Sequence, residues 1–123
     1  MPEIIISFKD KKIKATLNES ETAKKIFNAL PLKITANLWG DEIYSKIPVK
    51  TGLEKNAAEE VEPGTLAYWP PGQAICIFFG KTPASTSEKP RAASKVNLIG
   101  KTQQPEAFKL VKEGDSILIN RKQ

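Results

Sequence analysis

The sequence of 123 residues contains no histidine, one cysteine and only two arginines. Without histidine, the chain lacks the commonest general base near neutral pH and the commonest nitrogen ligand of zinc. With Cys76 as the only thiol, it cannot form a Ser-His-Asp triad, a Cys-His pair, an intrachain disulfide or a Cys/His metal site. We therefore predict no catalytic residues, no metal and no cofactor, and we favour a protein that is not an enzyme.

Long apolar runs are also missing. No stretch approaches a membrane-spanning segment, and the opening MPEIIISFKD lacks the order of regions found in a signal peptide. A single thiol suits a reducing compartment. We expect a cytoplasmic protein without membrane contact.

The formal charge of +5 comes almost entirely from lysines that are scattered among acidic residues. Sequence-specific DNA binding depends on arginine forks and a recognisable motif, and neither is present. The charge pattern is typical of a solvated surface, and we predict no nucleic-acid partner.

What the sequence does contain is a series of short β-type segments. They alternate apolar and polar residues or run apolar throughout, and turn signals separate them. One segment has helical spacing: in residues 19–30 the apolar side chains fall at i, i+3, i+4 and i+7, Asn18 or Ser20 can cap the start, and Pro31 ends the helix. Residues 105–111 form a short helical turn. The longest stretches of loop composition are 50–62 and 80–95.

About eight strands and one main helix predict a mostly β protein, a single domain over residues 1–123 whose sheet closes into an eight-stranded barrel. Gln73–Phe79 has the continuous apolar pattern of a strand that is buried on both sides.

Three stretches, ANLWGDEIYSKIP, AYWPPGQAICIFFGKTPAS and SKVNLIGK, resemble the cyclophilin-like domain family of small archaeal and bacterial proteins. The resemblance covers nearly the whole chain and implies a cyclophilin-type barrel with a helix at one end. True cyclophilins are prolyl isomerases that use an arginine in a Phe-His-Arg-Val-Ile-Pro stretch. This chain has acidic residues in its nearest segment, Leu38–Tyr44, so the resemblance implies the fold and not the activity.

Aromatic residues beside turns are the candidates for a binding site. Large aromatic side chains fill a core more often than they line a cleft, but a ring held by prolines at a strand end is accessible to a ligand. Glu42 has two interpretations, a solvent-facing or salt-bridged carboxylate, or part of a polar rim on the same strand face as Tyr44. The predicted binding residues are Trp39, Glu42, Tyr44, Tyr68, Trp69 and Arg91.

Three functions follow from this pattern. We favour a binding module for a small molecule or peptide at an aromatic-rimmed cleft. The alternatives are a prolyl isomerase that lacks the usual arginine and histidine, and a structural or interaction protein, for which a homodimer is one form. Cys76, within an apolar strand, is interpreted as a small buried hydrophobic residue.

Overall fold

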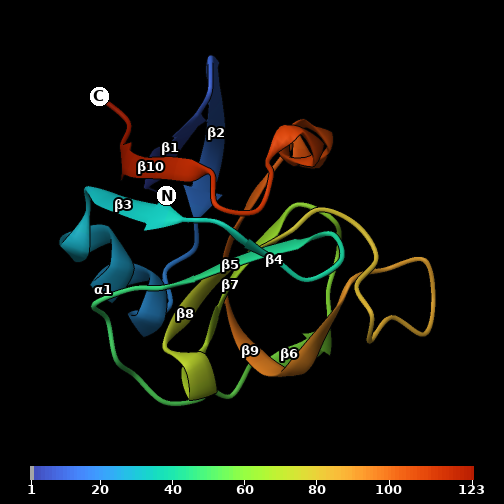
Figure 1. Ribbon diagram of the computed structural model, residues 1–123. Coiled ribbons are helices and arrows are strands. Elements are labelled where there is room, and N and C mark those ends of the chain that lie inside the picture. The colour runs from blue at the N-terminus through green and yellow to red at the C-terminus, as the bar shows by residue number, and fades with distance from the viewer. Residues whose placement is uncertain (1) are drawn as a thin grey trace.

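The computed structural model describes residues 2–123, and β-strands are the main secondary structure among them (Figure 1). Alternating apolar residues account for most of these strands, because successive side chains point to opposite faces of a sheet. The strands, in chain order, are β1 (Glu3–Phe8), β2 (Lys11–Leu17), β3 (Leu32–Thr35), β4 (Asn37–Leu38), β5 (Glu42–Lys46), β6 (Ala58–Glu60), β7 (Thr65–Trp69), β8 (Ala74–Phe78), β9 (Arg91–Thr102) and β10 (Ser116–Arg121).

The main helix, α1 (Glu21–Ala29), confirms the helix predicted from spacing, with its ends slightly shorter than expected. The Ser20 side chain caps it by accepting a hydrogen bond of 3.1 Å from the backbone N–H of Ala23. Two 3₁₀ helices complete the set, η1 (Pro70–Gly72) and η2 (Pro105–Leu110). The second of these corresponds to the predicted helical turn near 105–111. No helix within residues 2–123 is long and apolar enough to cross a membrane.

The mostly β prediction is confirmed, but the predicted closed eight-stranded barrel is wrong in two respects. The sheet has ten strands in the order β3-β10-β1-β2-β9-β7-β8-β5-β4, and β6 pairs with β9 outside this path. Its two end strands, β3 and β4, do not pair with each other. Only one residue, Ala36, separates them in the chain. This connection is too short for the backbone to turn back so that β4 could pair with β3. The sheet is therefore not closed into a barrel.

Ala36 also explains why the predicted single strand over Leu32–Leu38 is divided. Its N–H donates to the carbonyl of Asp115 (2.8 Å), and its carbonyl accepts from the N–H of Gly114 (2.9 Å). These bonds change the direction of the backbone at Ala36. As a result β3 pairs with β10, whereas β4 pairs with β5.

Two segments predicted as loops contain strand. The stretch 50–62 includes β6, and β9 begins at Arg91, so the loop expected over 80–95 covers only 80–90. The first half of β9 pairs with β6, and the second half pairs with β7 and β2. In Figure 1, β9 curves from β6 back across the sheet, and the 80–90 loop projects beside it.

Strands β7, β8 and β9 contribute buried side chains to both faces of the sheet, whereas on the outer face of β5 Glu42 is buried and Tyr44 is exposed. Every residue of β8 is buried, which confirms the interpretation of this apolar run. One face, called the inner face here, belongs to the main core, which includes Ile43, Leu66 and Ile77. The other, called the outer face, carries a smaller apolar cluster around Ala67, Cys76 and Phe78 with Trp69 packed against it. The candidate site lies on the outer face.

Candidate functional site

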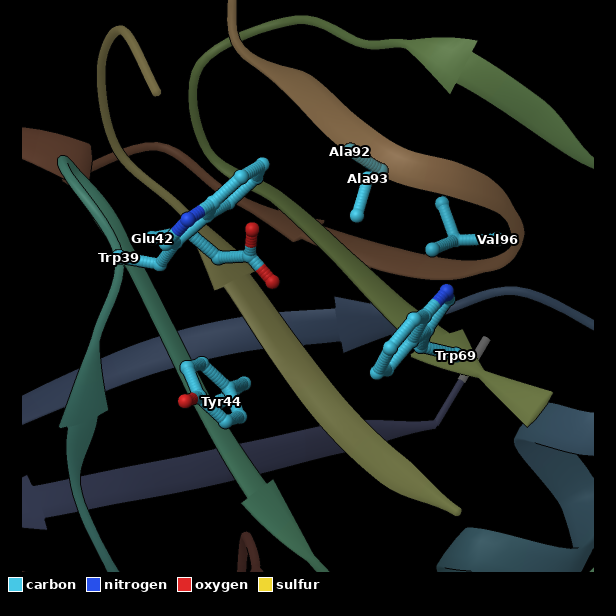
Figure 2. Close-up of a pocket in the computed structure, with 7 residues that line it drawn as sticks. All are labelled: Trp39, Glu42, Tyr44, Trp69, Ala92, Ala93 and Val96. Atoms are coloured by element: carbon cyan, nitrogen blue, oxygen red, sulfur yellow. The ribbon is translucent and has the colours of Figure 1, made fainter. Parts of the chain in front are cut away.

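A cavity of about 250 Å³ opens on the outer face, between β5 and the first half of β9 (Figure 2). Its walls are largely apolar. The lining residues are Trp39, Glu42, Tyr44, Trp69, Ala92, Ala93 and Val96. Two other surface hollows are larger, at about 490 and 520 Å³, but neither has an aromatic side chain or a buried carboxylate in its lining. The cavity of about 250 Å³ combines aromatic walls with a buried carboxylate, which is typical of ligand sites.

Trp39 and Glu42 are brought together by a tight turn. The Trp39 N–H donates to the Glu42 carbonyl (2.9 Å), and the Glu42 N–H donates back over 3.3 Å. Gly40, between them, has a φ of +62°, which glycine adopts without strain. Residues that close such a turn project to the same face of the hairpin. The turn thus directs the indole and the carboxylate into the same cavity.

The segment that follows β8 holds this turn in place. The Asp41 N–H donates to the Lys81 carbonyl (2.8 Å), and the Phe79 N–H donates to the Asp41 carbonyl (2.9 Å). A Cβ on Gly40 would lie 2.9 Å from the Cα of Thr82, and one on Gly80 would collide with the Asp41 side chain. Both glycines are needed for this close approach. The contacts with residues 79–82 fix the backbone that carries Trp39 without the help of a ligand.

Trp69 is held from two sides. Its indole Nε1–H donates to Ser94 Oγ (2.7 Å) on β9, which satisfies the polar edge of the ring. The Pro70–Gly72 turn packs against the ring itself, where a Cβ on Gly72 would lie 2.6 Å from the ring carbon Cε3. The sequence argument for a rigid aromatic beside Pro-Pro-Gly therefore agrees with the packing of this ring.

Glu42 differs from the simpler of its two sequence interpretations. It is neither solvent-facing nor salt-bridged: it is only 6% exposed, and no ion pair within residues 2–123 includes it. Figure 2 shows its carboxylate directed between the two indole rings. Burial raises the pKa of Glu42 to about 7, and a hydrogen bond with the Cys76 thiol opposes this rise.

Cys76 is buried beneath the cavity, as its apolar context predicted. It lies opposite Tyr44 in the ladder between β5 and β8. Burial and the neighbouring Glu42 carboxylate both raise the pKa of the Cys76 thiol. A thiol in this state is a poor nucleophile at neutral pH.

Of the six predicted site residues, four line the cavity: Trp39, Glu42, Tyr44 and Trp69. Tyr68 lies outside it, because its side chain points to the inner face and its hydroxyl donates to the Val49 carbonyl (2.6 Å). Arg91 lies outside it as well, since its guanidinium pairs with Glu59 at 2.6 Å.

Ala92, Ala93 and Val96 complete the cavity and were not predicted. They belong to the first half of β9, whose sequence RAASKV has the composition of a loop. This segment becomes a strand, and so a wall of the cavity, by pairing with β6. No local signal in the sequence indicates that pairing.

The fold and the site together describe a mostly β protein with a cavity on one face of a doubly packed sheet. The chain belongs to the Cyclophilin-like family, whose model matches residues 2–120. It is similar to a hypothetical protein from Archaeoglobus fulgidus known from its solution structure, with 42% sequence identity and a TM-score of 0.82 over 98% of this chain and 95% of that one. A search of curated protein sequences finds no match.

Proposed function

We propose that this protein is a binding module that takes a small molecule, or one side chain of a peptide, into the cavity on the outer face. The observation that carries the proposal is the combination of three aromatic side chains and one buried, inward-facing carboxylate around about 250 Å³. Apolar walls supply affinity, and a single polar group fixes orientation. The volume suits a compact ligand group better than an extended peptide.

Preorganisation supports the same proposal. Trp39 sits on a turn fixed by backbone hydrogen bonds, and Trp69 is held by Ser94 and by the Pro70–Gly72 turn. Side chains that are already ordered lose little conformational entropy when a ligand binds. No comparable observation favours the isomerase alternative: Arg91 pairs with Glu59, and the Arg121 guanidinium lies 5.1 Å from the centre of the Phe27 ring.

The two tryptophans of the chain both line the cavity, so every indole signal of the protein reports on it. The experiment is a screen of small fragments by two-dimensional ¹H–¹⁵N NMR. We expect hits that shift both indole N–H resonances. If no fragment of a broad library shifts either one, the proposal is wrong.

A matched pair of variants locates the hits. Ala93 is exposed at the cavity wall, and Ala93→Leu should fill the opening and abolish the shifts. Ala84→Leu adds the same side chain to the 80–90 loop, away from the lining, and should preserve them. Shifts that persist in Ala93→Leu would place the ligand elsewhere.

A further inference from the structure

We propose that the ligand group of this cavity is an organic cation, specifically a quaternary or fully methylated ammonium. The inference rests on the proposed binding function and adds the charge and chemical class of the ligand. It is carried by the position of the Glu42 carboxylate among Trp39, Tyr44 and Trp69.

The first step is the sign of the charge. No lysine or arginine is among the lining residues, and Glu42 is the only acidic one. The nearest arginine in the chain, Arg91 at the start of β9, is neutralised by Glu59. A buried carboxylate is costly unless an opposite charge compensates it, and within residues 2–123 no protein cation does so. A ligand cation would supply the missing partner.

The second step is the aromatic wall. The faces of tryptophan and tyrosine rings carry negative potential, so they attract a cation that lies over them. Figure 2 shows the indoles of Trp39 and Trp69 on opposite sides of the Glu42 carboxylate, with the Tyr44 ring on a third side. A cation in this space would meet ring faces and a carboxylate together.

The third step separates methylated ammonium from a primary one. A primary ammonium has three N–H donors and needs about three acceptors when buried. The lining side chains offer three acceptor oxygens, two on the Glu42 carboxylate and one on the Tyr44 hydroxyl, and the rest of the lining is indole, alanine and valine. Figure 2 shows the Tyr44 hydroxyl at the end of the ring that points away from Trp69, so a primary ammonium between the indoles would meet the carboxylate alone and leave at least one N–H group without an acceptor. Methyl groups need no acceptors and pack well against apolar walls. The lining therefore favours the methylated form.

The affinity should depend on the ionisation of Glu42. Its neighbours that can titrate are the Tyr44 phenol on the same strand and the Cys76 thiol from β8. Asp41, the next residue in the chain, packs against Gly80. No titratable residue of β7 faces the cavity, and from β9 the facing residues are Ala92, Ala93 and Val96. Since the pKa of Glu42 is about 7, the ionised fraction should rise about tenfold between pH 6 and pH 8.

The test uses two probes of nearly the same shape: choline, which carries a quaternary ammonium, and 3,3-dimethylbutan-1-ol, its neutral carbon counterpart. Tryptophan fluorescence gives the affinity of each for the full chain. At pH 8 we expect choline to bind at least about tenfold more tightly than the alcohol, and this preference to fall about tenfold at pH 6. The quaternary ammonium does not titrate, so the change reports on the protein.

Two variants provide the controls. Glu42→Gln keeps the shape of the side chain and removes its charge, so it should leave only the smaller preference for choline that comes from the ring faces, and this preference should be the same at pH 6 and pH 8. Glu106→Gln removes an exposed charge on η2, away from the cavity, and should leave the preference unchanged. Retained folding of Glu42→Gln is checked by its far-UV circular dichroism.

The outcomes separate this inference from the proposed function. Equal binding of both probes, or tighter binding of the alcohol, overturns the cation assignment and leaves the binding function standing. If neither probe binds, the cation assignment is also overturned, and the fragment screen decides the binding function on its own. A choline preference that is as large in Glu42→Gln as in the wild type at pH 8, or that still falls between pH 8 and pH 6 in this variant, contradicts the role given to the carboxylate.

Discussion

The two faces of the β5-β8-β7 sheet have opposite characters, although their residues alternate along the same strands. On the inner face, Ile43, Ile77 and Leu66 lie opposite one another across the three strands, and all are fully buried. The next pair in the same ladder, Tyr44 of β5 and Cys76 of β8, lies on the outer face. The inner row is aliphatic and closely packed, whereas the outer surface holds aromatic rings, a thiol and a carboxylate around a cavity.

This difference suits two separate roles for one short sheet: stability for the inner face and, in the function that we propose, recognition for the outer face. A strand alternates its side chains, so each residue of the inner row contributes to the core without occupying the outer face. We therefore expect substitutions on the inner face to change mainly stability, and those on the outer face to change mainly binding and pH dependence.

The largest effect is expected from a truncation on the inner face. Ile77→Ala removes a fully buried side chain between Ile43 and Leu66 and leaves a void. We expect a loss of about 2–5 kcal/mol in the free energy of unfolding, measured by urea denaturation. A loss below about 1 kcal/mol would mean that the inner face is not the tightly packed side of the sheet.

A smaller effect, of opposite sign, is expected from removing the charge on the outer face. The pKa of Glu42 is raised from its usual 4.5 to about 7 in the folded state. Between these pH values the unfolded chain has released the proton and the folded chain has kept it, so stability falls as the pH rises. Above pH 7 the full cost applies, up to about 3 kcal/mol.

Glu42→Gln should remove this cost. We expect the variant to exceed the wild type in free energy of unfolding by up to about 3 kcal/mol at pH 8 and to match it near pH 4.5. Parallel urea titrations across this range provide the measurement, with Glu106→Gln as the exposed control. A constant difference between variant and wild type at all pH values would contradict the assignment.

The smallest effect concerns the support of Trp69. In Gly72→Ala the new methyl group would collide with the indole, whereas in Gly52→Ala it would meet nothing within 4 Å. We expect the first variant to lose about 1–3 kcal/mol and to shift the tryptophan emission, and the second to stay within about 0.5 kcal/mol of the wild type. Equal behaviour of the two variants would show that the Pro-Pro-Gly turn does not hold the ring.

The sequence predicted the elements whose stability is local. The apolar stripe and Ser20 cap of α1, and the uninterrupted apolar run of β8, carry their structure in their own composition. The turn around Gly40 and the Pro-Pro-Gly stretch likewise indicated where aromatic residues would be held, and Trp39, Glu42, Tyr44 and Trp69 do gather at one cavity.

The parts that escaped prediction depend on partners distant in the chain. Ala58–Glu60 and the first half of β9 are polar segments that become strands by pairing with each other, and composition favours loops there. The open sheet could not be foreseen either, since it depends on Ala36 bonding to the 114–115 turn. Tyr68 was predicted as a binding residue, but its side chain points to the inner face; a strand with apolar residues on both sides gives no sign of which face is which.

The most direct test of this account is the titration of Glu42 itself, followed through its side-chain carboxyl carbon by ¹³C NMR and assigned by the loss of that resonance in Glu42→Gln. A carboxylate enclosed by aromatic walls without a protein cation should titrate with a midpoint of about 7. A midpoint near the usual 4.5 would mean that water or a cationic side chain already satisfies it, and the account of the outer face would be wrong.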